Sequence, residues 1–235
     1  MQYPYFLWSL LLVIPWLAVY VRLPDRQSRK HLLTVSLLTA PLVTEPIFVP
    51  EYWLPPTLFD LAARTGFDTE SLIFSFAVGG LASVGYDVFL VRHRVSIPVE
   101  GRRTRRHRYH LPVLLSAPVL FGILYLATSW NPIYSASLAL LVAGMLTWYC
   151  RPDLVRSMFA TGILFALFYF VFFLTLARFH PLYVEQVWNL GAISGALVAG
   201  VPLEELLFAF SFGFLWSSAY EHATWRSYES REVRA

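Results

Sequence analysis

Charged side chains are scarce in this chain of 235 residues, since Asp, Glu, Lys and Arg together make up 14%. A typical soluble domain carries about 25% charged residues, so this sequence lacks the polar surface that a water-exposed globule needs. Hydrophobic residues reach 57% and aromatic residues 17%. The composition excludes a disordered chain, a nucleic-acid-binding module and an ordinary soluble enzyme, and it indicates an integral membrane protein.

Cysteine and lysine are nearly absent. Cys150 is the only cysteine, which excludes an internal disulfide and any cysteine-rich zinc or iron–sulfur site. Lys30 is the only lysine and lies in a polar cluster at 26–31. No membrane helix therefore offers a lysine for a retinal Schiff base.

Several cofactor and metal motifs are also missing. No glycine-rich dinucleotide motif follows a strand, and no Asp-rich pair is present that would hold a magnesium diphosphate. An intramembrane protease of the E-E-x-x-x-R type would have an arginine four positions after Glu204, where Phe208 stands. We therefore expect no cofactor and no metal.

Seven segments approach the length of about 20 apolar residues that a helix needs to cross a bilayer. They predict an all-α integral membrane protein with seven transmembrane helices. The first segment has no basic n-region and no small-residue cleavage site, so we expect a retained span rather than a cleaved signal. The predicted spans are 4–21, 31–48, 70–91, 111–128, 134–150, 157–177 and 203–220.

The positive charges predict how these spans are oriented. Sixteen of the 18 Lys and Arg residues fall in the first, third and fifth connections and in the C-terminal tail, and the other side keeps only Arg64 and Arg178. Because cytoplasmic loops carry the excess of Lys and Arg, we expect a multi-pass protein of the cell membrane with its N-terminus outside and its C-terminus cytoplasmic. The basic run at 102–110 then indicates contact with anionic lipid headgroups rather than with nucleic acid.

The two halves of the sequence resemble each other. Residues 70–81 (ESLIFSFAVGGL) align with 204–215 (EELLFAFSFGFL) at a constant offset of 134, with identical Glu, Leu, Phe and Gly positions. The pattern predicts two parallel three-helix repeats related by a pseudo-two-fold axis along the membrane normal. The expected units are 1–92, a basic loop and connecting helix at 93–133, the second repeat at 134–222 and a cytoplasmic tail at 223–235.

Four glutamates fall near the outward ends of the predicted spans: Glu45, Glu70, Glu204 and Glu205. Ionisable groups at membrane depth are costly and are functional candidates by default. The first turn of a helix stabilises an anion while apolar surroundings disfavour it, so such a carboxyl can donate a proton and tolerate the negative charge. For Glu45 and Glu205 a purely structural role at a helix end is an equally good interpretation.

Aromatic residues accompany these carboxyls. Most of them are expected to serve packing or the interfacial belt, yet aromatic faces also attract cations by about 0.5–2 kcal/mol. An acid beside aromatic walls is what carbocation chemistry on an isoprenoid needs. Gly79, Gly213 and the Gly191-x-x-x-Gly195 spacing predict close helix contacts. The candidate aromatic residues are Trp53, Phe74, Tyr86, Trp188, Phe208, Phe210 and Tyr220.

The P-L-E-E-L-L-F motif at 202–208, its E-S-L-I-F counterpart at 70–74 and the duplicated plan resemble the lycopene cyclase domain family. The resemblance runs from Tyr3 to about Tyr220 and is closest to the archaeal type, in which two small subunits are fused. It implies a cofactor-independent isomerase that converts the acyclic ends of lycopene into β-ionone rings, giving γ- and then β-carotene.

The resemblance also implies roles for the glutamates. Glu204 is expected to be the leading general acid, with Glu205, Glu70 and Glu45 as proton relays or the final base. In the first repeat Ser71 replaces Glu205, so the two repeats need not be catalytically equal. The expected partners are membrane lipids and a carotenoid that comes from the bilayer.

Two other interpretations stay open from the sequence. A membrane carotenoid hydratase would quench the same cation with water, and a small-molecule transporter would also suit a parallel repeat. The sequence leaves open whether copies of the chain form a homo-oligomer.

Overall fold

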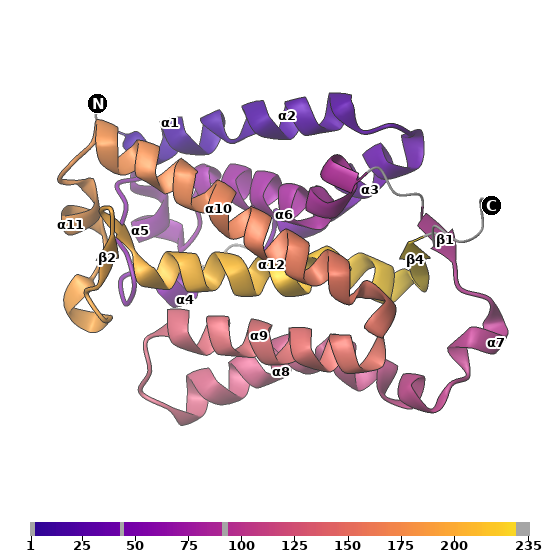
Figure 1. The fold of residues 1–235 in the computed structure, drawn as a ribbon. Coiled ribbons are helices and arrows are strands. Elements are labelled where there is room, and N and C mark those ends of the chain that lie inside the picture. The colour runs from indigo at the N-terminus through magenta and orange to yellow at the C-terminus, as the bar shows by residue number, and fades with distance from the viewer. Residues whose placement is uncertain (1–2, 43–44, 91–93, 229–235) are drawn as a thin grey trace.

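Helices make up most of the computed structural model, which describes residues 3–42, 45–90 and 94–228 (Figure 1). The longer helices are α1 (Pro4–Leu11), α2 (Val13–Arg22), α3 (Arg26–Thr39), α6 (Thr69–Leu90), α8 (His110–Ala127), α9 (Pro132–Cys150), α10 (Val155–Phe179) and α12 (Leu203–Thr224). The short helices are α4 (Glu45–Phe48), η1 (Leu58–Asp60), α5 (Leu61–Thr65), α7 (Val99–Arg102), η2 (Arg105–Tyr109), η3 (Pro152–Leu154), α11 (Tyr183–Val187) and η4 (Leu190–Ala192). The strands are β1 (Arg94–Ser96), β2 (Leu197–Val198), β3 (Val201–Pro202) and β4 (Arg226–Tyr228).

Five helical stretches of the described chain are long and apolar enough to cross a membrane, which identifies a membrane protein by length and composition. They agree with five of the predicted spans. α12 is as long as α6 but is not among the five. The stretches are Pro4–Arg22, Thr69–Val88, Arg105–Ala127, Pro132–Cys150 and Pro152–Phe179.

The predicted span at 31–48 is wrong as a single helix. α3 begins earlier, at Arg26, because Asp25 caps it by accepting a hydrogen bond from the Ser28 backbone N–H at 2.8 Å. It ends at Thr39, two residues before Pro41, which has no N–H to donate. With 14 residues, α3 is about 21 Å long and is shorter than the hydrocarbon core of about 30 Å.

α12 runs through the middle of the helical bundle and packs against α6, α9 and α10 (Figure 1). α6 packs in turn against α1, α2 and α3. The close approach predicted at two glycines is confirmed: a Cβ on Gly79 would lie 2.2 Å from the Thr39 hydroxyl oxygen, and one on Gly213 would lie 2.9 Å from Phe165 Cβ. Both positions therefore need glycine for helix packing.

The predicted helix contact at Gly191 and Gly195 is wrong, because this segment forms the turn η4 and a loop. Gly195 has a φ of +69°, which no helical residue adopts, and a Cβ on Gly191 would meet no atom within 4 Å. The loop continues into the antiparallel pair β2–β3, which leads directly into α12. It therefore covers the N-terminal end of α12, where the paired glutamates lie.

The two ends of the bundle differ in character (Figure 1). α5, α11 and β2 lie at the end where α6 and α12 begin, and β1 and β4 lie at the other end beside the arginine-rich segment α7–η2. β1 pairs with β4 antiparallel, with Val95 opposite Ser227. This pairing joins the segment after α6 to the end of α12.

Candidate active site

An apolar cavity of about 340 Å³ lies between α1, α3, α4, α6, α8, α9, α10 and α12. Its volume is at the lower end of the range of about 300–1,000 Å³ that is usual for small-molecule sites. Nearly half of the lining residues are aromatic. The aromatic lining residues are Tyr5, Phe48, Tyr52, Trp53, Phe74, Phe121, Tyr169, Phe173, Phe208, Phe212 and Trp216.

Glu205 is the one carboxylic acid among the described residues that line this cavity. Its side chain is buried, and its Oε1 accepts hydrogen bonds from the Tyr52 hydroxyl at 2.8 Å and from the Trp188 Nε1–H at 2.9 Å. Burial and the neighbouring charge of Glu205 raise the pKa of Tyr52 well above its ordinary value, so Tyr52 stays protonated and donates. These two donors thus hold the carboxyl against the cavity.

Pro202 positions Glu205 by starting α12. Pro202 is the N-cap residue, so Glu204 and Glu205 occupy the second and third positions of the helix. Successive helical residues point about 100° apart, which directs the two glutamates to different sides of α12. Their N-terminal positions favour negative charge through the helix dipole.

Glu204 is also buried but does not line the cavity. Its Oε1 accepts a hydrogen bond from the Tyr134 hydroxyl at 2.6 Å and another from the Ser194 backbone N–H at 3.0 Å. Glu204 therefore joins α12 to α9 and to the loop that precedes β2.

Glu70 has the equivalent position on α6 and does not line the cavity either. It is fully buried, and its Oε1 accepts a hydrogen bond from the Leu58 backbone N–H at 2.7 Å. The next residue, Ser71, lines the cavity and shares a hydrogen bond of 2.7 Å with the Tyr5 hydroxyl. The two halves are thus alike at these positions. The glutamate at the second helix position accepts a hydrogen bond from a preceding backbone N–H, and the residue after it lines the cavity.

Glu45 begins α4, whose Phe48 lines the cavity. The Glu45 side chain lies outside the part of the chain that the structure describes. Its predicted role as a proton relay or final base therefore stays a prediction.

Residues 131–223 match the family model of lycopene cyclase. The match supports a lycopene cyclase domain in this part of the chain. The match includes α9, α10 and α12, and thus both first-turn glutamates and Trp188. The match suggests an enzyme of carotenoid cyclisation. No curated protein and no solved structure matches the chain.

The lycopene cyclase segment and the first half of the chain meet at two tryptophans. Trp53 and Trp188 form an antiparallel backbone bridge, and their ring centroids are 5.6 Å apart. They lie 135 positions apart, so they correspond in the two sequence halves when the offset of 134 is given one residue of slack. Their pairing agrees with a pseudo-two-fold axis between the predicted repeats, although that axis stays a prediction.

The predicted aromatic residues divide into two groups. Trp53, Phe74 and Phe208 line the cavity, and Trp188 bonds to Glu205. The other three do not line the cavity, for reasons of helix geometry. Phe210 lies on another face of α12 and stacks with Phe214, whereas Tyr86 and Tyr220 are 16 residues, or about 24 Å, beyond the first-turn glutamates of their helices.

Sequence reasoning missed Tyr52, the hydroxyl donor to Glu205, and Tyr169 on the cavity wall. Tyr52 lies in the loop after α4 and Tyr169 lies in the middle of α10, where many aromatic residues follow one another. The position of Tyr52 next to Trp53 was the one available signal. Tyr169 carried none, because only packing selects which of the α10 aromatics faces Glu205.

Proposed function

We propose that this protein is a lycopene β-cyclase in which Glu205 is the general acid. The observation that carries the proposal is that Glu205 is the one carboxylic acid among the described residues that line a mainly apolar and aromatic cavity. The chain also contains a segment that matches the lycopene cyclase family. The reaction would convert each acyclic end of lycopene into a β-ionone ring without net oxidation or reduction.

The cavity suits one end of a carotenoid. Its volume of about 340 Å³ is small compared with the whole substrate, so we infer that one end group enters while the polyene remains in lipid. α8 contributes Phe121 to the wall, and other α8 side chains such as Val119 and Leu126 are exposed. An apolar substrate could then enter from the bilayer beside α8.

The first step would be proton transfer from Glu205 to C2 of the terminal C1=C2 bond, leaving a tertiary cation at C1. Tyr52 and Trp188 donate hydrogen bonds to Oε1 of this carboxyl, and Tyr169 is a further hydrogen-bonding neighbour. The donors Tyr52 and Trp188 would stabilise the carboxylate as it forms. They are already in place, so no reorganisation is needed.

The ring would close when the C5=C6 bond attacks C1, which forms the C1–C6 bond and moves the cation to C5. Loss of the C6 proton then restores the C5=C6 bond and gives the β-ring. Aromatic faces such as those of Tyr169, Phe212 and Trp216 would stabilise the cation in this mainly apolar cavity. The Glu205 carboxylate would take up the C6 proton, since it is the one carboxylate among the described residues that line this cavity.

This assignment gives Glu204 and Glu70 a positioning role. Each accepts a backbone N–H from the loop before its helix, and neither lines the cavity. Glu205 therefore replaces Glu204 as the leading acid in our proposal. Glu45 remains a candidate for proton relay.

We further propose that the bundle crosses the cell membrane with the glutamate end outward and the arginine-rich end cytoplasmic. The support is the positive-inside rule applied to the segment at 102–108, which lies at the opposite end of the bundle from the glutamates. A cysteine introduced at exposed Leu182 near the glutamate end should react with an impermeant maleimide in intact cells. Labelling only after cell lysis would contradict this orientation.

The function is tested by expressing the chain in a bacterium that accumulates lycopene. We expect lycopene to be replaced by γ- and β-carotene. Lycopene that persists while the protein is present in the membrane would contradict the proposal. Hydroxylated products would instead indicate a hydratase, which captures the same cation with water.

A further inference from the structure

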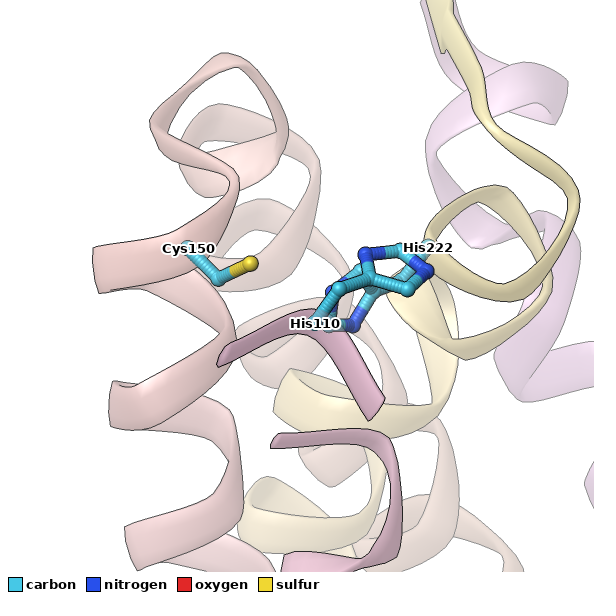
Figure 2. A group of neighbouring side chains, drawn as sticks. All are labelled: His110, Cys150 and His222. Atoms are coloured by element: carbon cyan, nitrogen blue, oxygen red, sulfur yellow. The ribbon is translucent and has the colours of Figure 1, made fainter. Parts of the chain in front are cut away.

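A second group of reactive side chains lies at the end of the bundle opposite the glutamates. His110 is the first residue of α8, Cys150 is the last residue of α9, and His222 lies in the last turn of α12 (Figure 2). One ligand atom from each of the three residues lies within 4.8 Å of the others. Within the described chain, this is the one cluster of three or more such side chains that could hold a metal ion.

Two ring nitrogens in this cluster are buried without a hydrogen-bond partner among the described residues: His110 Nδ1 and His222 Nε2. His222 is 1% exposed and Cys150 is fully buried. The Cys150 thiol donates a long hydrogen bond to the Arg106 carbonyl at 3.8 Å. A buried polar atom without a partner is costly, so each such atom in a folded protein requires an explanation.

The two imidazole rings are held in place by aromatic packing. The His110 ring stacks on Trp225 with 3.8 Å between centroids, and it meets the His222 ring edge-on at 4.3 Å. In Figure 2 the Cys150 sulfur points toward the two rings. The packing thus orients the rings without using the unpartnered nitrogens.

We propose that His110, Cys150 and His222 bind a Zn²⁺ ion, with water at the fourth position. Imidazole nitrogen and thiolate sulfur are the preferred ligands of Zn²⁺. In a tetrahedral site with usual bond lengths, such ligand atoms lie about 3.3–3.6 Å apart. Ligand atoms that now lie up to 4.8 Å apart would therefore move toward one another by about 1 Å when the ion binds.

The charge around the cluster is compatible with the cation. Arg151 follows Cys150 directly and is fully buried, but both oxygens of Asp153 neutralise it through hydrogen bonds at 2.9 and 2.7 Å. Ionisation of Cys150 would offset one of the two charges of Zn²⁺.

Such an ion would tie the start of α8 to the ends of α9 and α12. α8 is the connecting helix between the predicted repeats and is the least buried of the candidate spans. The ion would therefore fix the connecting helix to the second repeat. The site is separate from the cavity, so this proposal does not depend on the proposed function.

The test uses the full-length protein without a histidine tag, purified in detergent, stripped with a chelator and titrated with Co²⁺. We expect one Co²⁺ per chain, with the visible bands of a tetrahedral site and a near-ultraviolet thiolate-to-cobalt band, and displacement by equimolar Zn²⁺. Because Cys150 is the only cysteine in the sequence, a thiolate-to-cobalt band would identify Cys150 as a ligand without the need for a variant. A titration with no thiolate band would overturn the proposal even if a variant failed to fold.

Variants then test each ligand. Cys150→Ser and His222→Ala should weaken Zn²⁺ binding at least 100-fold and abolish the increase in unfolding temperature that Zn²⁺ gives the unmodified protein. His180→Ala is the matched control, because His180 lies at the opposite end of the bundle beside Trp8. It should bind Zn²⁺ as the unmodified protein does. Unchanged binding by both cluster variants would overturn the assignment.

Discussion

Replacing Glu205 by glutamine removes the proposed acid while keeping its shape and its place in the hydrogen-bond network. The amide oxygen of glutamine can still accept from the Tyr52 hydroxyl and the Trp188 Nε1–H, which now bond to Glu205 at 2.8 and 2.9 Å. The variant should therefore fold like the unmodified protein. Only the transferable proton and the negative charge are lost.

The expected effect follows from the role of the acid. General acid catalysis contributes typically 10²- to 10⁴-fold to a rate, and no other carboxyl among the described residues lines the cavity to replace Glu205. We therefore expect Glu205→Gln to lower the initial rate of ring formation by about 10²- to 10⁴-fold. A barrier increase of about 3–5 kcal/mol corresponds to this loss.

The assay follows lycopene consumption and cyclic products by chromatography, with the purified protein in lipid vesicles that contain the substrate. Glu204→Gln is the matched control, because it makes the same chemical change one residue earlier on α12. Its amide oxygen can keep the bonds from Tyr134 and Ser194, so we expect a loss below about tenfold. Full activity in Glu205→Gln together with an inactive, folded Glu204→Gln would refute the assignment and restore Glu204 as the acid.

Three further predictions concern the surroundings of the site. Tyr52→Phe should slow ring formation by about 10- to 150-fold, because a hydrogen bond to a charged group contributes about 1.5–3 kcal/mol; an unchanged rate would count against its role as a donor to Glu205. Gly79→Ala should lower the unfolding temperature, since its Cβ would lie 2.2 Å from a threonine oxygen of α3, whereas Gly122→Ala, with no atom within 4 Å, should not. Asp68→Ala should destabilise the protein by about 1 kcal/mol in chemical denaturation, because Asp68 caps α6 through a bond of 2.6 Å to a backbone N–H.

Hydropathy predicted most of the helices correctly because long apolar runs need no tertiary information. It failed at 31–48, where α3 starts before the apolar run, at the cap Asp25, and stops before Pro41. Local signals for capping and helix termination therefore outweighed mean hydropathy. The parallel arrangement of the repeats stays a prediction.

The sequence motif located the site but ranked its glutamates differently from the structure. Glu204 was favoured because it aligns with Glu70, yet the aligned pair holds the preceding loops, and the unmatched Glu205 lines the cavity. The glutamate that is repeated in both halves therefore has a structural contact in each half, a hydrogen bond to the segment before its helix. Which side of α12 faces the cavity depends on packing, which one sequence does not reveal.

The cluster of His110, Cys150 and His222 lay beyond sequence reasoning for a similar reason. Its members belong to three different helices and are separated by 40 and 72 positions, with no metal-binding spacing between them. Only the convergence of these helix ends brings the side chains together.

The central claim is that the protein closes rings by proton transfer alone. Its most direct test is incubation of the purified protein with lycopene in vesicles, with no added nucleotide, flavin or reductant, followed by mass spectrometry and chromatography of the product. The account predicts cyclic carotenoids with the same mass as lycopene. Unchanged lycopene in the presence of folded protein, or a product heavier by one water at each end, would contradict it.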